Sequence, residues 1–161
     1  MPPGARAAAE EVIALYPRPR SAVMPLLHLV QDEVGWVPSG AIQEVAELLG
    51  LTSAEVLGVC SFYTMFKLHP SGRLLVSVCT NVSCLVNGGP ELLSALERAY
   101  DDTPDVTVEE VECLAACDGA PVLQVNYEFF ERMTLESAER LIEECRSGER
   151  EARGMSGGRT R

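Results

Sequence analysis

Four cysteines in two close pairs are the residues of this sequence whose type and spacing could do chemistry. They are Cys79, Cys84, Cys113 and Cys117. Each pair follows an apolar, β-branched run with alternating character, which predicts a strand at 74–78 before the first pair and at 106–112 before the second. Two strand ends would therefore deliver four thiols, and folding could bring them to one place.

Four converging thiolates suit a metal centre better than disulfides, because the N-terminus lacks the apolar segment of a secretory signal. Zinc is one candidate, but structural zinc sites usually use Cys-x-x-Cys, and the gaps here are four and three residues. A [2Fe–2S] cluster has two irons that each take two thiolates, so two pairs on two loops match it. The spacing favours the cluster. The alternative is a different class of function, a structural module that a zinc ion stabilises.

The other cysteines and the histidines show no comparable pattern. Cys60 and Cys145 lie on helical patterns outside both loops, so we interpret them as ordinary helix thiols. His28 and His69 have no neighbouring cluster of ligands, and a structural or solvated role is predicted for both. No Cys-x-x-Cys occurs in the chain, which argues against a dithiol oxidoreductase.

Charge and hydropathy narrow the possible partners and location. The net charge is −11, from 24 acidic and 13 basic side chains, which argues against binding to nucleic acid or to an anionic membrane surface. No apolar run approaches the roughly 20 residues of a membrane-spanning helix, so direct membrane insertion is not expected. Free cysteines without a secretion signal predict a reducing, cytoplasmic location.

The stretch at 1–70 is predicted to form a helical bundle. Helical spacing of apolar residues predicts four short helices, at 5–16, 21–35, 39–50 and 52–61. Ser21 is the expected N-cap of the second helix, and Thr52 with Glu55 forms a capping box for the fourth. Gly35 and Gly50 are expected to end the second and third helices.

Three aromatic residues follow the predicted bundle: Phe62, Tyr63 and Phe66. We interpret them as the residues that pack the helical subdomain onto the sheet, because large aromatic side chains are more often buried than exposed. The alternative is contact with a flavin or with a partner protein.

The stretch at 71–145 is predicted to be a thioredoxin-like domain. Its expected elements are a strand at 74–78, a helix at 91–100, strands at 106–112, 121–126 and 128–133, and a helix from Thr134 to about 145. The predicted fold class is therefore α/β, with a helical bundle followed by a sheet that helices cover. The tail at 146–161 carries five Arg and two Glu, lacks periodicity and is predicted to be disordered.

Several motifs together carry a resemblance to a known family. They are Arg20-Ser21-Ala22-Val23-Met24-Pro25, Gly35-Trp36, Gly58-Val59-Cys60-Ser61-Phe62-Tyr63, Cys79-Thr80 with Cys84, Cys113-Leu114 with Cys117, Ala120-Pro121-Val122 and Gln124-Val125-Asn126. Over residues 9–145 the chain resembles the thioredoxin-like [2Fe–2S] subunit of NADH:quinone oxidoreductase, respiratory complex I. The chain also resembles the corresponding subunits of NAD-reducing and electron-bifurcating hydrogenases and of NAD-dependent formate dehydrogenases. These enzymes are the alternatives for the complex to which the chain belongs.

The resemblance implies one [2Fe–2S] cluster per chain, with the four paired cysteines as its ligands. It also implies an electron-transfer subunit with no catalytic residue or substrate site of its own. The expected partner is a flavoprotein subunit that binds FMN and NADH and carries a [4Fe–4S] cluster, together with further iron–sulfur subunits in a peripheral arm on the cytoplasmic face of the membrane. The absence of Gly-x-Gly-x-x-Gly and of a Walker-type loop from this sequence agrees with nucleotide binding on another chain.

The chain departs from the family pattern at three places. The family often has Gly where Ala115 stands, so a positive φ at this position would strain the alanine. A basic residue is common where Asn87 stands, and the segment at 101–106 is shorter than in many members. Because of the short segment, the sequence does not decide to which of these complexes the chain belongs, and complex I is the first choice.

Overall fold

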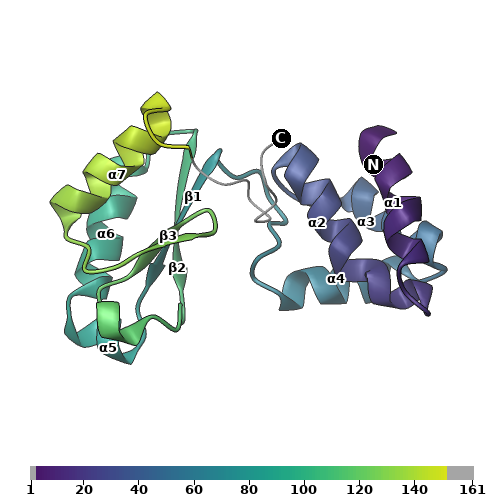
Figure 1. Ribbon diagram of the computed structural model, residues 1–161, viewed down its shortest axis with the longest axis horizontal. Coiled ribbons are helices and arrows are strands. Elements are labelled where there is room, and N and C mark those ends of the chain that lie inside the picture. The colour runs from purple at the N-terminus through teal and green to yellow at the C-terminus, as the bar shows by residue number, and fades with distance from the viewer. Residues whose placement is uncertain (1–2, 152–161) are drawn as a thin grey trace. The chain divides into compact units, whose positions relative to one another are not determined.

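Four α-helices and one 3-10 turn build the N-terminal part of the computed structural model, which describes residues 3–151 (Figure 1). They are α1 (Pro3–Ala14), η1 (Pro19–Ala22), α2 (Val23–Val34), α3 (Ser39–Leu49) and α4 (Ser53–Phe62). These helices belong to the first of two units into which the chain divides, Met1–Pro70 and Ser71–Arg161.

The expected helix ends are confirmed at three of the four positions. Gly35 and Gly50 adopt the left-handed conformation, with φ of 83° and 64°, and end α2 and α3. The Thr52 side chain accepts a hydrogen bond from the backbone N–H of Glu55, which completes the capping box of α4. The cap predicted at Ser21 is wrong: the 3-10 turn η1 runs directly into α2, whose N-cap is Ala22.

The core of the helical unit is formed by the apolar stripes of α2, α3 and α4. Fully buried members include Leu26, Leu27, Val30, Val45 and Val56. Gln31 is the buried polar residue of this core. Its amide nitrogen donates to the carbonyl of Met65 at 2.8 Å, and its amide oxygen accepts from the N–H of Lys67 at 2.7 Å. These two bonds fix the segment that leaves α4.

The three aromatic residues after α4 do not share one environment. Phe66 is 4% exposed and belongs to the core of the helical unit, where its ring lies 4.8 Å from that of His28. Phe62 is 77% exposed and Tyr63 is 38% exposed. Phe62 therefore lies outside the core of the helical unit, and its packing onto the sheet stays a prediction.

The second unit contains a four-stranded mixed sheet in the order β2-β1-β3-β4. Its elements are β1 (Leu74–Cys79), α5 (Val82–Val86), α6 (Gly89–Tyr100), β2 (Val106–Val111), η2 (Cys117–Gly119), β3 (Leu123–Val125), β4 (Glu128–Phe130) and α7 (Leu135–Ser147). β1 pairs in parallel with β2, while β3 is antiparallel to both β1 and β4. The predicted α/β class with a thioredoxin-like fold is confirmed.

Helices α6 and α7 lie on the same side of this sheet (Figure 1). Leu74, Val76 and Val78 alternate along β1 and pack against the apolar faces of both helices. β1 is the strand around which the unit is organised, since it has a neighbour on each side and is buried along its whole length. It ends at Cys79.

Helix α7 continues two residues into the segment predicted as a tail. It begins with a capping box at Thr134 and ends at Gly148, whose φ is 82°. The part of the predicted tail beyond Glu151 lies outside the described residues. Within residues 3–151 no single helix is long and apolar enough to cross a membrane; α3 and α4 pass that test only as a pair, bent by 119°.

Candidate functional site

The parallel pairing of β1 with β2 brings both cysteine pairs to one edge of the sheet. Cys79 is the last residue of β1 and stands in register with Val111, the last residue of β2. The N–H of Cys79 donates to the carbonyl of Val122 at 3.1 Å, and the N–H of Thr80 donates to that of Val111 at 3.3 Å. Strands that run the same way end at the same edge, so the two loops that follow them meet there.

The short helix α5 positions the second thiol of the first pair. Asn81 caps it by accepting the N–H of Val82 on its side-chain oxygen at 2.7 Å. The turn of helix points Cys84 inward, where it is 2% exposed, and Asn87 closes the helix by donating to the carbonyl of Ser83 at 2.7 Å. Helix α5 is not predicted from the sequence, because five residues are too few to show helical periodicity.

The second pair lies on a more exposed loop, and Cys113 and Cys117 both reach solvent. Ala115 stands between them with a φ of 57°, and its N–H donates to the sulfur of Cys113 at 3.3 Å. The positive φ that would strain an alanine is therefore present. The loop ends in η2, whose Gly119 N–H donates to the carbonyl of Ala116 at 3.1 Å.

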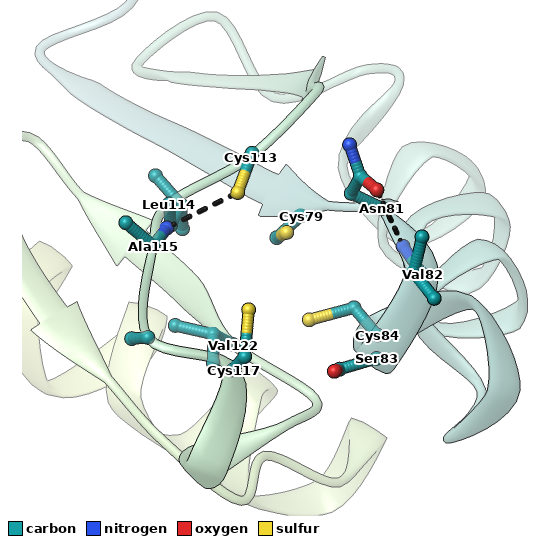
Figure 2. Close-up of a pocket in the computed structure, with 11 residues that line it drawn as sticks. Cys79, Asn81, Val82, Ser83, Cys84, Cys113, Leu114, Ala115, Cys117 and Val122 are labelled. Atoms are coloured by element: carbon teal, nitrogen blue, oxygen red, sulfur yellow. Dashed lines mark hydrogen bonds between the residues drawn. The ribbon is translucent and has the colours of Figure 1, made fainter.

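All four thiols line one pocket (Figure 2). The four sulfurs point into a common space: that of Cys79 from the end of β1, that of Cys84 from α5, and those of Cys113 and Cys117 from the loop that follows β2. The other lining residues are apolar or neutral: Asn81, Val82, Ser83, Leu114, Ala115, Ala116 and Val122. Among the described residues, thiols are thus the only ionisable groups in the lining, and such a soft donor set suits iron–sulfur clusters and zinc.

The four thiols are the donors that this pocket offers to a metal centre. Within residues 3–151, no three His, Cys, Asp or Glu side chains are grouped so as to hold one metal ion. The donor set fits a [2Fe–2S] cluster, because four thiolates are two for each of its two irons. Burial raises the pKa of Cys84, and the neighbouring Cys79 and Cys117 raise it further.

The thiols and imidazoles outside the pocket occupy other environments. Cys60 is buried in the core of the helical unit and Cys145 in the core of the second unit, and burial raises the pKa of both. His28 lies against Phe66, its Nδ1 has no hydrogen-bond partner among the described residues, and burial lowers its pKa. His69 is exposed.

Gly89 is a site residue that the sequence alone did not reveal. It is the first residue of α6 and is buried, and a Cβ at this position would lie 2.6 Å from the carbonyl oxygen of Cys79 and 2.9 Å from that of Cys84. The absence of a side chain lets α6 pack directly on the backbone of the first cysteine pair. The available signal is the Gly88-Gly89-Pro90 sequence, which by itself indicates only a turn.

Replacing Ala115 by glycine is expected to stabilise the protein. An L-residue other than glycine costs about 1–2 kcal/mol in the left-handed region, and glycine loses part of this gain through its more flexible unfolded chain. We expect Ala115→Gly to raise the free energy of unfolding by about 0.5–1 kcal/mol in urea titration. The matched control is Ala116→Gly at a negative φ, which should destabilise the protein; a destabilised Ala115→Gly would contradict the strain.

Comparisons with known proteins agree on the relatives of this chain. Residues 9–146 match the family model described as thioredoxin-like [2Fe-2S] ferredoxin. A protein of Mycobacterium tuberculosis (strain H37Rv) that is named as a subunit of NADH-quinone oxidoreductase is 47% identical over 146 residues, which cover 86% of this chain and 58% of that protein. NADH-quinone oxidoreductase subunit 2 of Thermus thermophilus is 41% identical over 151 residues, which cover 88% of this chain and 83% of that protein.

A solved structure supports the fold. The crystal structure of an NAD+-reducing [NiFe]-hydrogenase matches with a TM-score of 0.67 at 20% identity, and the match covers 78% of this chain and 22% of that chain. The chain spans 58% of the length of the mycobacterial relatives. The resemblance found from the motifs is confirmed by the matched family model and by the two named relatives.

Proposed function

The chain belongs to the thioredoxin-like [2Fe–2S] ferredoxin family, and on this basis we propose that it is the electron-transfer subunit of an NADH-quinone oxidoreductase. The observation that carries the proposal is the pocket at the ends of β1 and β2, which all four thiols line. Two relatives at 47% and 41% identity bear the name of this enzyme, which favours it over the hydrogenase and formate dehydrogenase alternatives.

The four cysteines are proposed to hold the cluster, one pair to each iron. When bound, the cluster supplies one-electron chemistry. Cys79 and Cys84, which are 4% and 2% exposed, would hold it from the protein interior, and the exposed Cys113 and Cys117 would hold it from the solvent side. A redox partner would reach the site from the side of the exposed pair, because the buried pair has protein behind it.

Two features of the chain determine the environment of the thiolates. Leu114, Ala116 and Val122 line the pocket with apolar surface, which keeps water away from the inner thiolates. The N–H of Ala115 points at the sulfur of Cys113 and stabilises negative charge there. This amide could not be identified from the sequence, because the positive φ of Ala115 sets its direction.

The proposed partner is a flavoprotein subunit that binds FMN and NADH and carries a [4Fe–4S] cluster. The resemblance implies this partner, and the names of the relatives support the coarser point that the chain works beside other subunits of an NADH-quinone oxidoreductase. Further iron–sulfur subunits complete the proposed assembly, in which this chain forms part of a peripheral arm at the cytoplasmic face of the membrane. In this role the chain has no substrate site and passes electrons between its cluster and the flavin.

Co-expression with the FMN-carrying subunit from the same genome tests this function. We expect a complex that reduces an artificial acceptor with NADH and whose EPR spectrum shows the [2Fe–2S] signal after NADH is added. The chain alone is expected to oxidise no NADH, because its sequence contains no nucleotide-binding fingerprint. NADH oxidation by the isolated, flavin-free chain would refute the proposed division of roles.

A further inference from the structure

Helix α5 presents an apolar face to solvent beside the cysteine pocket. Val82, Leu85 and Val86 are 71%, 56% and 77% exposed. Their spacing at i, i+3 and i+4 places them on one face of the helix, opposite to the buried Cys84. We call these three residues the α5 face. Val82 also lines the pocket, so the α5 face is continuous with the site (Figure 2).

Acidic side chains accompany the α5 face at this edge of the sheet. Glu110 and Glu112 stand at the end of β2, Asp118 stands in η2, and all three are exposed. The surface around the outer thiols therefore combines an apolar centre with negative charge.

We propose that the α5 face is the docking surface for the protein that exchanges electrons with the site, and that the partner meets it with an apolar patch bordered by Lys and Arg. The proposal rests on the proposed function and identifies its partner as the FMN-carrying subunit. Two observations support this occupant. The face adjoins the exposed cysteine pair, where a redox partner must approach, and the acidic surroundings complement a basic rim rather than a second acidic copy of this chain.

A double variant, Leu85→Asp with Val86→Asp, tests the α5 face. Val82 is left unchanged because it lines the pocket. The matched control is Phe129→Asp on β4, an apolar residue that is 52% exposed and does not line the pocket. EPR of the dithionite-reduced protein and far-UV circular dichroism establish that the site and the fold persist in each variant.

The measurement is the Kd for the FMN-carrying subunit by isothermal titration calorimetry. We expect the double variant to bind at least about tenfold more weakly and the control to bind like the wild type. We also expect the wild-type Kd to rise with salt, because a basic rim would be screened. Unchanged affinity in a double variant that keeps its EPR signal overturns the docking surface and leaves the proposed function standing.

Failure of the wild-type chain to bind the subunit would instead count against the proposed function and would overturn the docking surface with it. If the double variant loses its EPR signal, a photo-crosslinking residue at Val86 replaces it. Crosslinks to the FMN-carrying subunit would then support the proposal. Crosslinks only to a second copy of this chain, or none, would overturn it.

Discussion

Replacing any one of Cys79, Cys84, Cys113 or Cys117 by alanine is expected to abolish the EPR signal of the reduced protein and its red-brown colour. In the proposed site each thiolate would supply one of the two protein ligands to an iron, and among the described residues no carboxylate or imidazole lines the pocket to take its place. The loss should therefore be at least about tenfold in cluster content, measured as iron and acid-labile sulfide per chain. The same samples show whether zinc replaces the cluster.

The two remaining thiols provide matched controls. Cys60→Ala and Cys145→Ala each remove a buried sulfur from a different core, so each should lower the free energy of unfolding by about 1 kcal/mol while leaving the EPR signal intact. Loss of the signal in Cys145→Ala with its retention in Cys117→Ala would reverse the ligand assignment. A colourless wild-type protein with one bound zinc would support the structural-module alternative instead.

Features set by short stretches of chain could be predicted from the sequence. The capping box at Thr52 and the left-handed glycines at Gly35 and Gly50 depend on a few neighbouring residues, and the structure has all three. The strand ends near Cys79 and Cys113 could also be predicted, because a β-branched run that stops at a cysteine can be recognised in the sequence alone. Parallel pairing then follows from the helix α6 between the two strands.

The features that failed depend on tertiary contacts. Ser21 is a good N-cap in isolation, but η1 precedes α2 without a break and removes the need for one. Likewise Gly89 matters through the backbone of Cys79 and Cys84, ten and five residues earlier in the chain. No local pattern distinguishes it from a turn glycine.

Helix α6 begins at Gly89, and its contact with the site leads to the second large effect that we expect. A Cβ on this residue would lie 2.6 Å from the carbonyl oxygen of Cys79, 2.9 Å from that of Cys84 and 3.1 Å from the carbonyl carbon of Cys84. All three atoms belong to the backbone, so no side chain can rotate away. Either α6 moves outward or the loop that carries both inner thiols moves, and each movement displaces ligands of the proposed cluster.

We therefore expect Gly89→Ala to lower the free energy of unfolding by about 3 kcal/mol, the upper range for inserting a methyl group into a packed interior. Cluster content should fall several-fold in the same variant, because Cys79 and Cys84 are two of the four proposed ligands. Urea titration measures the first effect, and iron content with EPR of the reduced protein measures the second.

Two other glycines separate this steric effect from the general cost of replacing glycine. At Gly88, φ is 90° and the nearest atom to an added Cβ is Glu91 Oε2 at 3.9 Å, so Gly88→Ala carries only a conformational cost of about 1–2 kcal/mol. At Gly40, inside α3, an added Cβ meets nothing within 4 Å, and alanine should be neutral or stabilising by up to about 1 kcal/mol. Both variants should keep the full EPR signal. A Gly89→Ala protein with wild-type iron content and stability would show that α6 does not constrain the positions of Cys79 and Cys84.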